Sequence, residues 1–157
     1  MEKNLEHLRL KIPPLAHFAL AALLMWLLSR WLDAETSYSV LWSLLVILLV
    51  VAGLAIIILA GLTLYFGKTT LDPRRPEQTA RLITEGVFSF SRNPVYLGLL
   101  LVLLGLGFYL NSLYAVPGLP LYWGMVTWLQ IIPEERALAA RFGEPYRQYC
   151  SRVRRWL

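Results

Sequence analysis

The sequence predicts an all-α integral membrane protein: a bundle of about four transmembrane helices with a cytoplasmic C-terminal amphipathic helix. Two observations support this fold class. Of the 157 residues, 57% are hydrophobic and the mean hydropathy is +0.55, whereas soluble domains are about 45–50% apolar. The apolar residues also gather in runs too long for a soluble core. We therefore interpret residues 1–157 as a single membrane domain.

Four apolar runs are candidate membrane spans, because each approaches the roughly 20 helical residues that cross a hydrocarbon core of about 30 Å. In the second run, Ala-Gly pairs at 52–53 and 60–61 predict a face that packs closely against a neighbouring helix. Asn111 and Ser112 alone separate the third run from the fourth, which predicts a tight hairpin, and the prolines after them leave room for a late helix start. The runs are residues 14–32, 40–66, 94–110 and 113–132.

Positive charge lies almost entirely on one side of these runs. Of the 15 lysines and arginines, 14 precede the first run, separate the second from the third, or follow the fourth, and only Arg30 lies at the opposite side. The positive-inside rule then places both termini in the cytoplasm. Because the basic residues alternate with long apolar runs, the net charge of +5 favours a membrane surface as partner, and we expect no nucleic-acid binding.

Residues suited to chemistry fall in two polar segments, the first of which leads into the third apolar run. There, Asn93 is placed as an N-cap and Pro94 as the first helical residue. A helix start with free N–H groups attracts anions. Arg92 beside it can hold a carboxylate or a phosphate, and Tyr96 can pack on a ligand. The structural alternative is a capped helix with an arginine that reaches the membrane surface.

The second polar segment opens with Glu134 and Glu135. Adjacent carboxylates at a membrane boundary are unfavourable unless they are solvated, paired or used. The alternatives are therefore a functional role and a turn in which Glu135 pairs with Arg136 or a loop arginine. Beyond Gly143, aromatic residues recur at helical spacing opposite arginines, which predicts a basic amphipathic helix on the membrane. With two histidines and one cysteine in the chain, we expect no metal site.

Residues 86–98, GVFSFSRNPVYLG, and residues 134–149, EERALAARFGEPYRQY, resemble the isoprenylcysteine carboxyl methyltransferase and phospholipid methyltransferase superfamily. The resemblance covers residues 69–157, and its first part is similar to bacterial members. It implies an integral membrane methyltransferase that uses S-adenosylmethionine from the cytosol. It also implies a lipophilic or amphipathic small acceptor that arrives through the bilayer, which for a bacterial chain is the inner membrane.

The resemblance implies site residues as well. Arg92 and Glu134 are the candidate catalytic residues, which would orient the acceptor or balance charge. The positions that contact the cofactor in the superfamily fall on Arg81, Leu82, Ile83, Phe88, Asn93, Pro94, Val95, Tyr96 and Glu135.

Two positions depart from the pattern of the superfamily. Asn93 stands where many relatives have histidine, which keeps a polar cap but removes a titratable group. Ile131 stands where the eukaryotic prenylcysteine branch has a substrate-binding arginine, which favours a lipid, a thiol or another small amphipathic acceptor over a carboxylate. Two other functions remain open: an NADPH-dependent membrane reductase of the related sterol reductase type, and a non-catalytic membrane protein whose motifs only cap helices.

Overall fold

The computed structural model describes residues 13–31, 39–69 and 79–157. Within these ranges the regular structure is entirely helical, as the sequence predicts. Two long helices come first, a short 3-10 turn precedes the third, and a set of shorter helices follows. In chain order the elements are α2 (Pro14–Trp31), α3 (Val40–Phe66), η2 (Gly86–Ser89), α4 (Pro94–Leu110), η3 (Leu113–Ala115), α5 (Gly118–Val126), η4 (Thr127–Ile131), α6 (Ile132–Phe142) and α7 (Glu144–Arg152).

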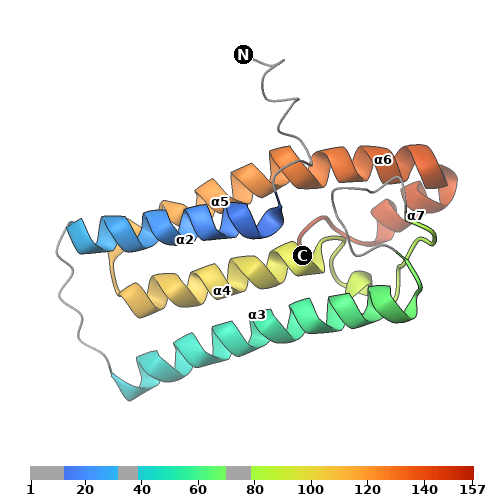
Figure 1. Cartoon of the computed structure of the whole chain (residues 1–157). Helices are drawn as coiled ribbons and strands as arrows, with labels where there is room; N and C mark the ends of the chain where they lie inside the picture. The colour runs from blue at the N-terminus through green and yellow to red at the C-terminus, as the bar shows by residue number, and fades with distance from the viewer. Residues whose placement is uncertain (1–12, 32–38, 70–78) are drawn as a thin grey trace, which may run out of the picture.

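The helix α4 lies at the centre of the bundle, with α2 on one side and α3 on the other, and α5 runs beside α2 (Figure 1). The main core lies between α2, α4 and α5, where side chains such as Met25, Leu103 and Tyr122 are fully buried. Most of α3 points away from this core and leaves apolar side chains exposed along its length. Such a surface is stable only in an apolar surrounding.

A close approach between α3 and α4 confirms that the second run carries a packing face. A Cβ atom on Gly98 would stand 2.6 Å from the carbonyl oxygen of Gly53, and one on Gly53 would stand 2.5 Å from that of Gly98. Gly53 and Ala60 are buried, whereas a Cβ on Gly61 would meet nothing within 4 Å. One member of each Ala-Gly pair therefore faces α4, at the distance that small residues permit.

Two of the predicted spans, Pro14–Trp31 and Val40–Phe66, form helices long and apolar enough to cross a membrane, and α4 is a shorter apolar helix of 17 residues. The predicted run 113–132 has the late helix start that its prolines predict. Its first residues form η3, the helix begins at Gly118 directly after Pro117, and η4 joins it without interruption to α6. The number of spans and the sidedness of the chain remain predictions, and several basic residues on which the sidedness depends (Lys3, Arg9, Lys11, Arg74, Arg75) lie outside the described ranges.

The predicted helix in the tail is present as α7. Gly143, at a φ of +56°, separates α6 from α7, a backbone conformation that glycine adopts without strain. In α7 the aromatic face is covered by protein, since Tyr146 and Tyr149 are buried against Leu82 and Leu138. The helix ends at Arg152, so the last aromatic residue of the predicted stripe lies beyond it in an irregular segment. The sequence pattern of an apolar helix face is the same whether lipid or protein covers that face.

Candidate active site

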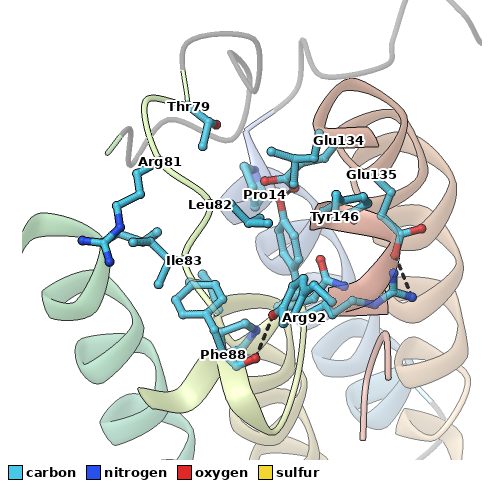
Figure 2. A pocket seen from close by; sticks show the side chains of 17 residues that line it. Pro14, Thr79, Arg81, Leu82, Ile83, Phe88, Arg92, Glu134, Glu135 and Tyr146 are labelled. Atoms are coloured by element: carbon cyan, nitrogen blue, oxygen red, sulfur yellow. Dashed lines mark hydrogen bonds and ion pairs between the residues drawn. The ribbon is translucent and has the colours of Figure 1, made fainter. Parts of the chain in front are cut away.

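A pocket lies at the end of the bundle where α4 and α6 begin. It holds about 970 Å³ of open space, mouth included. Figure 2 shows Leu82, Ile83 and Phe88 on one side of it, and Glu134 and Glu135 on the other. All eleven residues that the sequence singles out line this pocket. The other lining residues are Pro14, Leu64, Thr79, Leu138, Tyr146 and Tyr149.

The turn that leads into α4 is held by the last residues of the chain. The backbone N–H of Arg92 donates to the carbonyl oxygen of Arg154 over 3.1 Å, and the side-chain amide of Asn93 donates to the carbonyl oxygen of Arg155 over 2.9 Å. Asn93 therefore occupies the predicted N-cap position, but its side chain makes no capping bond. The N–H groups of Val95 and Tyr96, in the first turn of α4, consequently have no acceptor one helical turn earlier.

Two arginines clamp the carboxylate of Glu135. Arg155 approaches it with Nε at 3.1 Å and Nη2 at 2.6 Å, a two-pronged contact, and Nη2 of Arg92 lies 3.2 Å from Oε1. Arg92 also donates to the Sγ atom of Cys150. The side chains of Arg92 and Glu135 are only 14% and 16% exposed. Glu135 therefore pairs with the loop arginine Arg92 and with Arg155, while it lines the pocket from α6. The adjacent carboxylate raises the pKa of Arg155.

Glu134 also lines the pocket. Its Oε2 atom accepts a hydrogen bond of 3.0 Å from the hydroxyl of Tyr96. Burial raises the pKa of Glu134 to about 7; the bond from Tyr96 opposes this shift, and the carboxylate of Glu135 adds to it. The two neighbouring glutamates thus differ in their contacts: Glu135 is paired with two guanidinium groups, whereas Glu134, with a pKa of about 7, can gain or lose a proton near neutral pH.

The opposite wall is mostly apolar. Ile83 is buried, and the carbonyl oxygen of Phe88 accepts a hydrogen bond of 2.7 Å from the hydroxyl of Tyr149, which ties this wall to α7. Arg81 lines the pocket, but its guanidinium group points away from Glu134 (Figure 2). It lies 3.9 Å from the carboxylate of Glu85, and both side chains are well exposed. Arg81 therefore lies at the mouth of the pocket, with its backbone closer to the pocket than its guanidinium group.

Several residues of the site have no signal in the sequence motifs. Pro14 and Leu64 come from apolar helices whose composition does not distinguish one residue from the next. Arg155 belongs to a basic stretch, and its partner Glu135 is 20 positions away, so no local spacing reveals the pair. Tyr146 and Tyr149 do stand out as an aromatic face, but that pattern does not say which surface covers it.

The comparisons with known proteins agree with these motifs. The phospholipid methyltransferase family matches residues 41–145. A protein from Haemophilus influenzae, described only as uncharacterised, is 40% identical over 63 residues, which are 40% of this chain and the whole of that protein. No solved structure matches the chain. Since the family match covers more than half of the chain, with all of the first motif and residues 134–145 of the second, the chain belongs to the phospholipid methyltransferase family, a part of the isoprenylcysteine carboxyl methyltransferase-like superfamily.

Proposed function

We propose that this protein is an integral membrane methyltransferase that uses S-adenosylmethionine and acts on a lipophilic or amphipathic small acceptor. The observation that carries the proposal is the convergence of the eleven candidate residues, from segments as far apart as residues 81 and 135, on one pocket. Membership in a methyltransferase family supports the reaction type. The apolar helices support a membrane setting.

The chemistry of the pocket fits S-adenosylmethionine, which has a positive sulfonium group, an amino acid end and a nucleoside. Glu134 supplies a carboxylate in a partly buried place, and Phe88 and Tyr96 supply aromatic rings, both of which favour a cation. The N–H groups at the start of α4 suit a carboxylate. The cofactor would bring an electrophilic methyl group to this pocket.

The contacts of the two glutamates suggest different roles for them. Glu135 is engaged by Arg92 and Arg155, so it would hold Arg92 in place as part of the pocket wall and meet the cofactor only at its edge. Glu134 is then the carboxylate that balances a positive charge within the pocket. Since its pKa is about 7, it can also take up a proton that an acceptor loses on methylation.

The lining residues support approach of the acceptor from the apolar side. Pro14 is at the start of α2 and Leu64 is near the end of α3, two helices that lie on opposite sides of α4 (Figure 1). A lipophilic acceptor that approaches along either helix would reach the pocket without crossing its polar mouth. Catalysis would then depend chiefly on alignment of acceptor and methyl group and on exclusion of water.

Calorimetry in detergent tests this function with S-adenosylmethionine, S-adenosylhomocysteine and NADPH as separate ligands. We expect the first two to bind to the wild type. Val95→Trp should fill the pocket and weaken both by at least about tenfold. Val116→Trp, at a half-exposed position outside the pocket, is the matched control and should bind as the wild type does.

Binding of NADPH alone would favour the reductase alternative, and binding of none of the three ligands would favour a non-catalytic protein. Once binding is established, incubation with methyl-labelled cofactor and native membrane extract identifies the acceptor through its labelled product. A labelled product that is water-soluble and lacks an apolar portion would contradict the proposed acceptor class.

A further inference from the structure

A second cavity adjoins the first and shares Arg92, Glu135 and Tyr146 with it. It holds about 760 Å³ of open space, mouth included. The rest of its wall comes from α6, from α7 and from Arg155 after α7, and none of the cofactor-binding residues implied by the family resemblance lines it except Glu135. The two cavities therefore lie next to each other, with the Arg92–Glu135 pair between them.

Positive charge dominates this second cavity. Four arginines line it, Arg92, Arg136, Arg147 and Arg155, against the single carboxylate of Glu135. That carboxylate is already occupied, because Arg92 and Arg155 both contact it. Arg147 has an exposed partner in Glu144, 2.8 Å away, and such an exposed pair contributes little and rearranges readily.

The guanidinium groups that line this cavity indicate the class of ligand that suits it. Among common ligands, a phosphate ester offers several oxygen acceptors and one or two negative charges, a geometry that guanidinium groups bind in pairs.

The surroundings of the cavity favour a phosphate that belongs to a lipid. Ile132 is in the cavity wall, and Trp128, about one turn earlier in the same continuous helix, is 65% exposed. The basic groups of the cavity thus lie about one helical turn from an exposed apolar side chain. This arrangement suits a lipid whose phosphate contacts the arginines and whose acyl chains lie along the helix. We propose that the cavity between α6 and α7 binds the phosphate group of an anionic membrane lipid.

Native mass spectrometry of the full chain in detergent tests this site with phosphatidylglycerol as the probe and diacylglycerol as the phosphate-free comparison. We expect phosphatidylglycerol to bind selectively. A double substitution of Arg136→Gln and Arg147→Gln should weaken it by about tenfold. The matched control, Arg152→Gln with Arg154→Gln, removes the same charge from exposed positions outside the cavity, and it should bind as the wild type does.

Inorganic phosphate distinguishes the two sources of the group. Displacement of phosphatidylglycerol by millimolar phosphate would support a site that reads the phosphate itself. Equal losses in both double variants, or equal binding of diacylglycerol and phosphatidylglycerol, would overturn the proposal, and binding of free phosphate by a protein that does not bind phosphatidylglycerol would overturn the lipid source. Calorimetry with S-adenosylhomocysteine in the same variants should show unchanged affinity, since Arg136 and Arg147 do not line the first pocket. This separates failure here from failure of the proposed function.

Discussion

The hydroxyl of Tyr96 donates a hydrogen bond of 3.0 Å to Oε2 of Glu134. This contact joins the first turn of α4 to the first turn of α6, and so joins the two sequence motifs. It also stabilises the ionised form of a carboxyl group that burial drives toward its neutral form. The pH at which Glu134 ionises therefore depends on a contact between the two halves of the site, and this makes the site testable by titration.

Affinity for S-adenosylmethionine should rise with pH through about 7. Only the ionised form of Glu134 attracts a sulfonium group, so we expect a gain of up to about tenfold between pH 6 and pH 8. S-Adenosylhomocysteine has no charge on sulfur and should show a smaller change. Calorimetry with both ligands measures this, and Glu134→Gln should remove the difference between them. An equal pH response of the two ligands in the wild type would contradict the assignment.

Folding stability should respond to the same group in the opposite direction. The pKa of Glu134 rises from an ordinary 4.5 to about 7 on folding, so between these values the folded chain binds a proton that the unfolded chain releases. Stability therefore falls as pH rises from about 4.5 to about 7. Thermal unfolding in detergent should show this slope, and Glu134→Gln should flatten it. If the thermal unfolding temperature of the wild type rises with pH over this range relative to that of Glu134→Gln, the raised pKa of Glu134 is contradicted.

Replacing Tyr96 with phenylalanine should move the ionisation of Glu134 to higher pH, because the hydroxyl that stabilises the carboxylate is gone. The ring is 5% exposed and remains in the core, so we expect a loss of only about 1 kcal/mol in the free energy of unfolding. The pH dependence of S-adenosylmethionine binding measures the shift. Tyr109 is 57% exposed, so Tyr109→Phe is the control. It should leave the pH midpoint of S-adenosylmethionine binding unchanged.

Glu135→Gln should destabilise the protein strongly. The change leaves Arg92 and Arg155 beside a neutral amide, and loss of one partner from a largely buried ion pair costs about 3 kcal/mol. Glu144→Gln is the matched control, since it breaks an exposed pair with Arg147 and should cost less than about 1 kcal/mol. Unfolding midpoints of the two variants in one detergent give the comparison. Similar midpoints would show that Glu135 is not a structural anchor.

Gly98→Ala should separate α3 from α4, because the added methyl group would lie 2.6 Å from the carbonyl oxygen of Gly53 and from Cγ1 of Ile57. We expect a loss of about 1–3 kcal/mol. Gly124→Ala, on α5, meets nothing within 4 Å and should gain up to about 1 kcal/mol from helix propensity. Unfolding midpoints check both changes. If Gly98→Ala is as stable as Gly124→Ala, the close approach of the helices is wrong.

The sequence predicts the bounds of those helices that begin at a capping residue or at a proline. Ser39 caps α3 and accepts a hydrogen bond from the N–H of Trp42, and the predicted run 40–66 matches the helix at both ends. Pro94 likewise starts α4. The start of the fourth helix is marked less sharply, because apolar composition continues through η3 and Pro117, where backbone geometry, not hydropathy, decides whether a helix forms.

For the candidate site, too, the sequence predicts one part and not another. The sequence motifs name residues that come together around the pocket, but they do not reveal which partner each residue has. Glu135 could pair with any nearby arginine, and only the return of the chain beneath α4 brings Arg155 to it. Tyr149 shows the same gap: its hydroxyl reaches the carbonyl oxygen of Phe88, 61 positions earlier, a contact that no local spacing predicts.

The bond from Asn93 to Arg155 spans 62 positions, and this bears on the order in which the protein is made. The turn before α4 leaves the ribosome well before the residues that hold it. Helices α2 and α3 can enter the bilayer while the pocket still lacks one of its walls. A nascent chain that has inserted but not yet been completed should therefore be unable to retain a ligand in the pocket.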